Sequence, residues 1–392
     1  MKAFAVLALF IAAVSAEVYF KETFGDGWEK RWVKGDKEAY KGDFKLSAGK
    51  HGTDKGIMTT PDASFFGIVA TAEKEFGNED KKLVLSYSVK SDQALTCGGN
   101  YIKLHPASVK PAEYTRDVPY FIMFGPDQCG SDKKIHTIFN YSGEAKLWKK
   151  TPRPEADKLT HVYTLIVNPD NTYEVQVDQK KVESGSLEED WDFLAPKVID
   201  DPEDKKPEDW VDSEMMDDAE DKKPEDWDKA PETIADPEAS QPDDWDEEED
   251  GKWEAPMIPN PDFKGEWKAK QIKNPAYKGV WAPKQIENPA YKPDVNLYLS
   301  REPLQSVSID LWQVEAGSVF DNFIIADNLD EVNAFIDSTW AKSKDAEKTA
   351  TDAAEEAQKA KDEEARKAAE AEAKSKEDAK GDDEDDEEKD EM

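Results

Sequence analysis

The chain has 392 residues, and this length allows two or three domains of ordinary size. Of its residues, 36% are charged and 38% are hydrophobic. Its 88 acidic and 52 basic residues give a formal net charge of −36 at pH 7. Nucleic-acid binding requires a basic surface, so this charge argues against nucleic acid and favours divalent cations or basic partners. Two cysteines and four histidines also exclude a zinc-rich or disulfide-dense scaffold.

The first sixteen residues have the pattern of a signal peptide. Lys2 precedes an apolar run from Ala3 to Val14, and the small residues at 14–16 form a signal-peptidase site. No later apolar stretch of the sequence approaches the roughly 20 residues that span a bilayer. We therefore expect removal of residues 1–16 and a soluble mature chain in an oxidising lumen. A buried N-terminal helix is the alternative.

Short strands dominate the part that follows. Apolar residues alternate with polar ones from 83 to 89, which is the period-2 pattern of a half-buried strand. Apolar runs on both sides of the turn at 168–171 predict a hairpin. Cys97 and Cys129 are the only cysteines, and in an oxidising compartment they predict one disulfide. Two free buried thiols are the alternative.

Two sets of repeats with opposite net charge come next. In residues 195–250, which hold 25 acidic and 6 basic residues, Lys-Pro-Glu-Asp-Trp or a close variant occurs three times. In residues 251–292, with a net charge of +4, three tryptophans lie 14 residues apart and an Asn-Pro pair follows each. So much proline prevents a broad core, so we expect a linear array of tryptophan clusters. Opposite charges predict an antiparallel hairpin arm with its tip near 245–253, and a disordered linker is the alternative.

After the repeats the chain returns to a strand and then becomes helical. The alternation at 307–311 predicts another strand of the same antiparallel sandwich, which the arm leaves and re-enters. An apolar stripe at helical spacing predicts a helix packed on the sandwich, formed by Leu329, Val332, Phe335, Ile336 and Trp340. Beyond it, residues 341–392 are rich in Ala, Glu and Lys with a net charge of −10, so we expect any helix there to be exposed.

Several of these motifs together resemble the calreticulin family. They are the two repeat types and the runs TCGGNY at 96–101, IMFGPD at 122–127 and LWQV at 311–314. The resemblance covers nearly the whole mature chain. Calnexin, which shares the repeats, has a transmembrane helix that this sequence lacks. The chain is therefore similar to the soluble members of the family.

The resemblance implies a mainly β fold, a legume-lectin-like jelly-roll sandwich with an inserted proline-rich hairpin arm and a C-terminal helix that runs into an acidic tail. After the signal peptide at 1–16, it divides the chain into a globular domain at 17–194 and 293–340, an arm at 195–292 and a calcium-binding tail at 341–392. The implied function is that of a calcium-binding lectin chaperone of the endoplasmic reticulum. Such a protein binds monoglucosylated high-mannose glycans on folding glycoproteins, buffers calcium and is a monomer.

The family's sugar contacts correspond by motif to eight residues of this chain. Rings and apolar side chains cover the less polar faces of a hexose, while lysine and aspartate bond its hydroxyl groups. The eight residues are Tyr101, Lys103, Tyr120, Met123, Asp127, Ile138, Asp310 and Trp312. Core packing is the alternative role for the aromatic and Met positions.

The resemblance also implies two kinds of calcium site. One tight site in the globular domain, formed by backbone carbonyls and one carboxylate, corresponds to Thr23, Thr53, Lys55 and Asp321. Ligation by oxygen alone suits Ca²⁺. The acidic tail, in contrast, is expected to bind many Ca²⁺ ions weakly, without a fixed cage.

The ends of the arm and of the chain carry further expectations. In the family, acids and a tryptophan at the arm tip bind an oxidoreductase of the protein-disulfide-isomerase type, and Glu248, Asp250 and Trp253 match that pattern. Lys252 stands where the family usually has an acid. The last four residues, Lys389-Asp390-Glu391-Met392, look like a Lys-Asp-Glu-Leu retrieval signal with a changed last residue, which predicts partial secretion.

Other function classes fit the sequence less well than a lectin chaperone. The sequence has no P-loop, Gly-x-Ser-x-Gly or His-Glu-x-x-His motif, and its histidines have no metal-ligand spacing, so we expect no enzyme. Asp127 and Asp310 could form the acid pair of a glycosidase, but as acceptors from sugar hydroxyls they have a sufficient role. A calcium-storage protein with little glycan binding is the main alternative function.

Overall fold

The computed structural model of the chain describes residues 16–242, 245 and 251–384. Its contacts divide the chain into two units. One consists of Met1–Ala195 with Ala290–Met392, and the other of Pro196–Pro289. The predicted signal peptide, apart from Ala16, lies outside the described residues.

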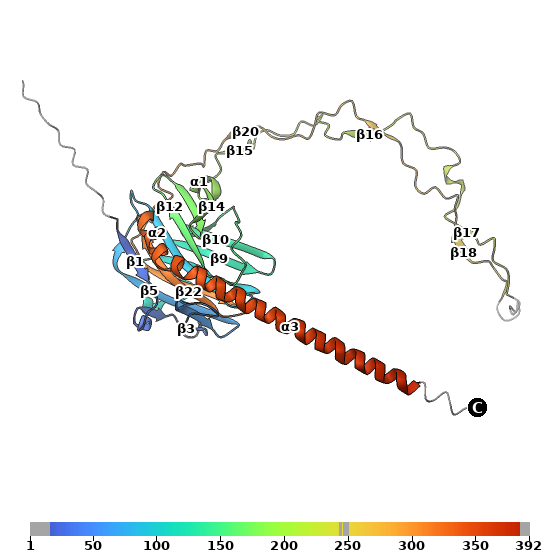
Figure 1. Cartoon of the computed structure of the whole chain (residues 1–392). Helices are drawn as coiled ribbons and strands as arrows, with labels where there is room; N and C mark the ends of the chain where they lie inside the picture. The colour runs from blue at the N-terminus through green and yellow to red at the C-terminus, as the bar shows by residue number, and fades with distance from the viewer. Residues whose placement is uncertain (1–15, 243–244, 246–250, 385–392) are drawn as a thin grey trace, which may run out of the picture. The chain divides into compact units, whose positions relative to one another are not determined.

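The first unit is built on two antiparallel sheets of eight strands each, which confirms the predicted sandwich (Figure 1). The strands of the first sheet run in the order β14-β13-β12-β6-β22-β4-β3, with β1 paired to β22. They are β1 (Val18–Glu22), β3 (Asp43–Ser47), β4 (Gly56–Thr60), β6 (Leu83–Ser91), β12 (His161–Val167), β13 (Thr172–Val177), β14 (Lys180–Ser186) and β22 (Ser318–Ala326).

The second sheet has the order β11-β10-β9-β7-β21-β5-β2, and β8 pairs with β21 and β9. Its strands are β2 (Trp32–Lys34), β5 (Ser64–Phe76), β7 (Cys97–Gly99), β8 (Ile102–Pro106), β9 (Ile122–Cys129), β10 (Asp132–Tyr141), β11 (Glu144–Leu147) and β21 (Leu304–Gln313). This unit also contains three short helical segments: η1 (Trp28–Lys30), η2 (Pro111–Glu113) and α1 (Leu187–Asp190).

Strand alternation places the core between the two sheets, as the sequence predicted. On β21, Val307, Ile309 and Leu311 point into the core, so Ser308 and Asp310 point to the opposite face. The hairpin predicted around 168–171 is β12–β13, and the strand predicted at 83–89 is β6. The hairpin and the strand are confirmed, but β6 is buried on both faces and is not the half-buried strand that the alternation predicted.

A helix covers the other face of the first sheet. This helix, α2 (Leu329–Ser338), begins at Asn328, whose side chain accepts hydrogen bonds from the backbone N–H groups of residues 330 and 331. Its stripe of Val332, Phe335 and Ile336 packs on β6, β12 and β22, which confirms the predicted packing. Since both faces of β6 are covered, even its polar side chains Ser86, Ser88 and Lys90 are buried.

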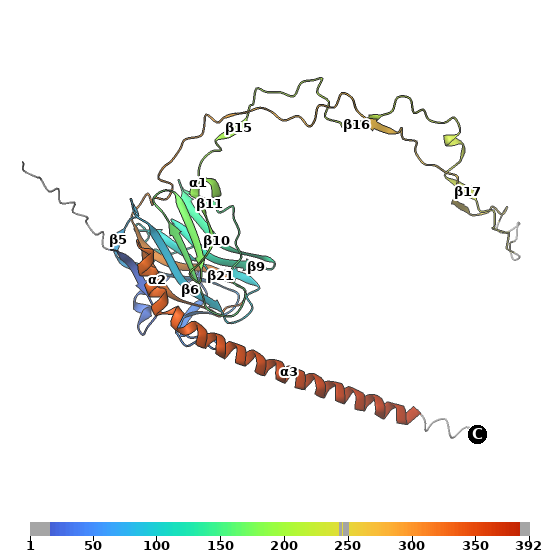
Figure 2. The same cartoon turned by 45° about the horizontal axis from the view of Figure 1, so that its top comes forward.

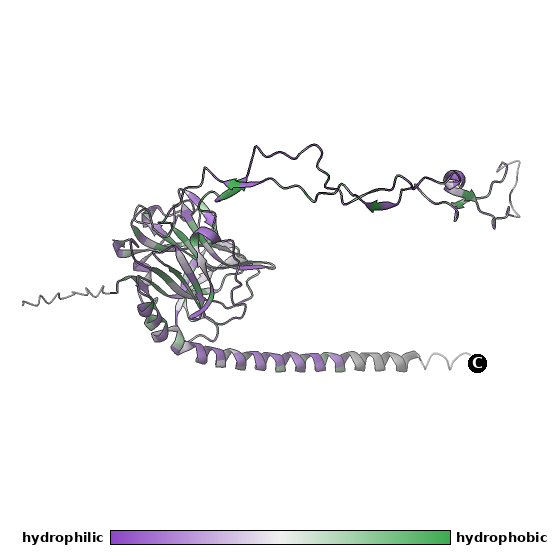
Figure 3. Cartoon of the chain, turned by 90° about the horizontal axis from the view of Figure 1, so that it is seen from above, coloured by the Kyte–Doolittle hydropathy of each residue, from purple (hydrophilic) through white to green (hydrophobic). Residues whose placement is uncertain are grey.

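The long helix α3 (Trp340–Glu384) follows directly (Figure 2). Up to residue 372 this helix is mostly hydrophilic (Figure 3), and most of its side chains there are exposed, as expected for a helix without an apolar face. The expectation of an exposed helix is wrong at its beginning, where Glu347 is only 3% exposed. Among the described residues, no helix is long and apolar enough to cross a membrane.

The second unit is the predicted antiparallel hairpin arm. Three pairs of short strands hold its two sides together, β15 with β20, β16 with β19 and β17 with β18. Their bounds are β15 (Val198–Asp200), β16 (Met215–Asp217), β17 (Thr233–Ala235), β18 (Met257–Pro259), β19 (Gln271–Lys273) and β20 (Gln285–Glu287), with the short helix η3 (Trp227–Lys229) between β16 and β17.

Tryptophans of the acidic repeats connect the two sides of the arm. The indole Nε1 of Trp210 donates to the carbonyl of Gly279, and that of Trp227 donates to the carbonyl of Gly265, each at 2.8 Å. The Nζ of Lys278 lies over the Trp210 ring, 5.7 Å from the ring centre. Basic repeats therefore do lie beside acidic ones, and each cross-link is local.

Candidate functional site

The eight predicted sugar contacts lie on one face of the second sheet or in the loops beside it. Because Ile102, Leu104, Ile122 and Phe124 point into the core, the residues between them on β8 and β9 point outward. We call this the outer face. It includes the side chains of β8, β9, β10 and β21, four neighbouring strands in this sheet.

Strand register makes the apolar and charged members neighbours. Lys103 on β8 pairs with Met123 on β9, which in turn pairs with Ile138 on β10. On the other side, β21 carries Asp310 and, two residues later on the same face, Trp312. Six strand residues of this set thus lie on the same face of the sheet.

The polar centre of the outer face is an ion pair. The Nζ of Lys103 lies 2.6 Å from Oδ2 of Asp310, and the two side chains are 12% and 5% exposed. The same ammonium group lies 5.2 Å from the centre of the Tyr120 ring. One lysine thus connects an acid from β21 with an aromatic ring from the loop before β9.

Tyr101 and Asp127 complete the set. Burial, and then the charges of Asp127 and Asp310, raise the pKa of the Tyr101 hydroxyl, which therefore stays protonated and able to donate. Oδ2 of Asp127 lies 3.1 Å from Nε2 of His136, a residue that the sequence did not suggest. The Tyr101 and His136 rings meet edge to face with centroids 6.3 Å apart.

A buried hydrogen-bond network supports this surface and was not predicted. Nε2 of His105 and the hydroxyl of Tyr114 each lie 2.7 Å from Oγ of Ser308. Burial lowers the pKa of His105 to about 4, so its ring is neutral at pH 7. The nearby Tyr40 hydroxyl is buried and has no hydrogen-bond partner in the described part of the chain.

The predicted disulfide is present. Cys97 on β7 and Cys129 on β9 are directly paired, and their sulfurs are bonded. Two residues along, Gly99 pairs with Asp127, so the disulfide fixes the end of the strand that carries this predicted sugar contact.

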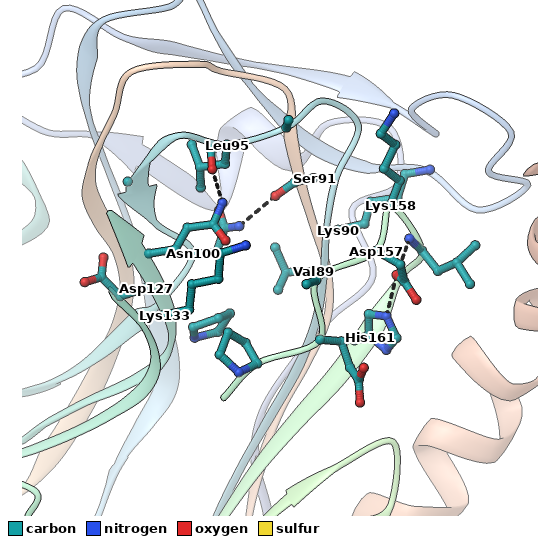
Figure 4. Close-up of a pocket in the computed structure, with 18 of the residues that line it drawn as sticks. Val89, Lys90, Ser91, Leu95, Asn100, Asp127, Lys133, Asp157, Lys158 and His161 are labelled. Atoms are coloured by element: carbon teal, nitrogen blue, oxygen red, sulfur yellow. Dashed lines mark hydrogen bonds and ion pairs between the residues drawn. The ribbon is translucent and has the colours of Figure 1, made fainter. Parts of the chain in front are cut away.

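A cavity of about 150 Å³ lies at this end of the sandwich (Figure 4). Several of its polar side chains bond one another: Asn100 donates to Oγ of Ser91 at 2.9 Å, and His161 contacts Asp157 at 2.8 Å. Burial alone would lower the pKa of His161, but its hydrogen bonds with Asp178 and Asp157 raise it to about 9. These internal bonds stabilise the cavity wall.

The predicted calcium ligands lie elsewhere, on the helix-covered side of the first sheet. Asp321 on β22 is buried, and its Oδ1 has no hydrogen-bond partner among the described residues. Its side chain lines a small cavity with Thr53 and Asp54, from the loop between β3 and β4. Thr23 lines an adjoining opening together with Thr53. Lys55 lines neither of these two cavities.

The sequence analysis did not identify two further residues in this region whose oxygen atoms could bind a cation. Asn322 also has a buried Oδ1 without a described partner, and Asp54 contributes a second carboxylate. Burial and the charge of Asp54 raise the pKa of Asp321 to about 8. The Oδ1 atoms of Asp321 and Asn322 are thus buried without a hydrogen-bond donor among the described residues, and a cation could satisfy both.

The donor set fits a hard cation. No group of three or more His, Cys, Asp or Glu side chains among the described residues is placed to hold a metal. A cation here would therefore be bound by few carboxylates together with amide, hydroxyl and carbonyl oxygens, and Ca²⁺ accepts such a set.

Other predicted functional residues fall partly outside the described chain. At the predicted arm tip, Trp253 is described and partly exposed, while Glu248 and Asp250 lie outside the described residues. The four terminal residues of the predicted retrieval signal also lie outside them.

Comparison with known proteins gives the family. The sequence model of the calreticulin family matches residues 20–251 and 248–325. The chain belongs to the calreticulin family. It is 58% identical to a calreticulin of Euglena gracilis over 353 residues, covering 89% of this chain and 88% of that protein. It is 53% identical to a calreticulin of Caenorhabditis elegans over 360 residues, covering 91% and 90%.

A solved calreticulin structure agrees with the fold. The globular domain of T. cruzi calreticulin is 31% identical and superposes with a TM-score of 0.62, covering 87% of this chain and 99% of that chain. Membership of this family supports the roles of chaperone, lectin and calcium-binding protein. The chain is accordingly a calreticulin-type chaperone that binds calcium.

Proposed function

We propose that the outer face of the second sheet binds monoglucosylated high-mannose glycans on folding glycoproteins in the lumen of the endoplasmic reticulum. The observation that supports this most is the Lys103–Asp310 pair, at 2.6 Å and beside the Tyr120 ring. A paired lysine and aspartate offer a donor and an acceptor already oriented for hydroxyl groups. Orientation in advance lowers the entropic cost of binding.

The neighbouring side chains suit the rest of a hexose. The rings of Tyr101, Tyr120 and Trp312 and the apolar side chains of Met123 and Ile138 can cover the C–H faces of the sugar. Charge-assisted hydrogen bonds from lysine and to aspartate are stronger than neutral ones, so they select among hydroxyl positions. This role involves binding only, and we assign no enzymatic step to Asp127 or Asp310.

We assign calcium binding to two parts of the chain. The tight site consists of Asp321 with oxygens from Thr23, Thr53 and Lys55, and the unpartnered Oδ1 atoms of Asp321 and Asn322 support it. The acidic tail binds further ions weakly and buffers lumenal calcium. Like charges along the tail repel one another, so each bound Ca²⁺ relieves that repulsion.

The remaining parts of the chain complete the proposal. Residues 17–194 with 293–340 bind glycan, the arm at 195–292 carries the docking site, and residues 341–392 hold calcium. The oxidoreductase docks through Glu248, Asp250 and Trp253, and the monomer is kept in the lumen by its last four residues, with partial secretion. Removal of residues 1–16 precedes all of these roles.

A glycan array with purified variants tests the lectin role. Asp310→Asn removes the acceptor charge beside Lys103, so we expect loss of binding to glucosylated mannose oligosaccharides with the fold intact by circular dichroism. Asp132→Asn is the matched control, since that acid is 68% exposed at the turn between β9 and β10. Tyr101→Ala should also abolish binding. A blank array for the unaltered protein, with normal calcium uptake, would favour the storage function instead.

A further inference from the structure

The beginning of helix α3 is attached to the sandwich by a buried charge. Glu347 is 3% exposed, and its Oε1 lies 2.9 Å from Nζ of Lys90 on β6, a side chain that is 2% exposed. The same carboxylate accepts hydrogen bonds from the backbone N–H and the hydroxyl of Thr160, at 3.2 and 3.0 Å. Breaking such a buried pair leaves an uncompensated charge, so removal of one partner is costly.

Lys90 also holds the loop between β3 and β4. Its Nζ donates to the backbone carbonyl of Lys50 at 2.8 Å, while the N–H of Lys50 donates to Oδ2 of Asp92 at 2.7 Å. Asp92 in turn lies 3.2 Å from Lys90. Lys90 thus holds the carbonyl of residue 50, and Asp92, which is paired with Lys90, holds its N–H. Lys90 is in turn paired with Glu347.

This loop carries two of the four proposed calcium ligands, Thr53 and Lys55. Thr53 follows Lys50 by three residues, and the cavity that it lines with Asp321 is also lined by Lys90 and Glu347. The adjoining opening, lined by Thr23 and Thr53, has Lys342 at the start of α3 on its other side. The first turns of the helix therefore form one wall of the candidate calcium site.

We propose that Glu347 is a positioning residue for this calcium site, and that calcium binding and docking of the first turns of α3 favour each other. The proposal rests on the calcium site proposed above. Glu347 acts in two ways: it fixes Lys90 and hence the ligand loop, and it offsets the positive charge of Lys90 beside a bound cation. A contact that favours calcium binding must itself be favoured by calcium to the same extent.

Calcium titration calorimetry on the full chain tests the positioning role. Residues around metal ligands typically change metal affinity about 10- to 100-fold when mutated, so Glu347→Gln should weaken tight binding by at least about tenfold. Glu355→Gln, the same change at an exposed position of the same helix, should leave the affinity within about twofold of the unaltered protein. Asp321→Asn should abolish tight binding.

Hydrogen exchange provides a readout that needs no variant. At free calcium on the order of 10 µM, where a tight site fills, amides of residues 341–352 should exchange more slowly than without calcium. The slowing should disappear in Asp321→Asn and in Glu347→Gln. If calcium leaves the exchange of these amides unchanged in the unaltered protein, the coupling is refuted, whether or not the Glu347 variant folds.

The two proposals fail in different ways. If Asp321→Asn loses tight binding while Glu347→Gln binds calcium as tightly as the unaltered protein, the positioning role is wrong and the site stands. If Asp321→Asn keeps tight binding, the site itself is misplaced and the role of Glu347 falls with it.

Discussion

His161 lies between two carboxylates, and its replacement by glutamine measures how much that arrangement stabilises the fold. Its Nδ1 and Nε2 each lie 2.8 Å from an oxygen of Asp178 and of Asp157, respectively. At 1.36 kcal/mol per pH unit, the difference between the ordinary value of 6.5 and a pKa of about 9 corresponds to about 3 kcal/mol. Asp157 is half exposed, and solvent screens its share, so we expect about 2 kcal/mol.

The pH dependence follows from the direction of the shift. Because the folded pKa of His161 is raised, its contribution is present in full below about pH 6.5 and is lost as the pH rises through about 9. Urea unfolding followed by tryptophan fluorescence should show His161→Gln less stable by about 2 kcal/mol at pH 6, with the difference much reduced at pH 10.

Two results would refute this reasoning. In a proton NMR titration, the imidazole signal that disappears in His161→Gln should titrate near pH 9 in the unaltered protein, and a midpoint near 6.5 would show that the carboxylates do not hold its charge. An equal loss of stability at pH 6 and pH 10 would assign the effect to packing instead.

Three further variants test other contacts. Trp227→Phe removes the donor to a glycine carbonyl across the arm, at a loss of about 1 kcal/mol, so amides of β17 and β18 should exchange about fivefold faster. Unfolding of the sandwich should be unchanged, and a shifted sandwich transition would contradict the locality of these contacts. Replacing Cys97 and Cys129 by Ser should lower the unfolding free energy by about 3–4 kcal/mol in urea, because the bond closes a loop of sequence separation 32; an unchanged midpoint would show that the loop is already constrained. Tyr40→Phe deletes a buried hydroxyl without a described partner and should raise thermal stability by up to about 1 kcal/mol, whereas a loss would show that the hydroxyl bonds Asp310.

Much of the fold was predictable because its signals are local. At 83–89 and 307–311 the alternating apolar side chains face the core between the sheets and the polar ones face the opposite side, and the stripe from Leu329 to Trp340 lies on one helix face. Each pattern therefore appears in a short window. The arm was predictable for a related reason. Its tryptophans recur at fixed spacing, and Trp210 and Trp227 each donate to a glycine carbonyl of the repeat opposite.

The candidate sites were less accessible to such reasoning. Tyr101, Lys103 and Asp310 were proposed from family motifs, since half-buried aromatic and charged residues on a strand look the same in a core and in a binding face. Glu347 gave no signal at all. Its burial depends on Lys90 and Thr160, which are 257 and 187 residues away in the sequence, and its neighbours in the chain are exposed like those of any charged helix.

The order of the strands has a consequence for synthesis of the protein. The strands β21 and β22 lie in the interior of the two sheets, between partners made much earlier, yet they follow the arm in the chain. About 120 residues separate the end of β14 from the start of β21, and at ribosomal rates their addition takes roughly 6–24 s. Throughout that interval both sheets of the nascent sandwich lack a central strand and expose their apolar faces. The short strands of the arm, in contrast, can pair in turn, beginning with β17 and β18. A chaperone of other proteins therefore passes through an aggregation-prone stage of its own. Its dependence on chaperones should end only once residue 326 has left the ribosomal exit tunnel.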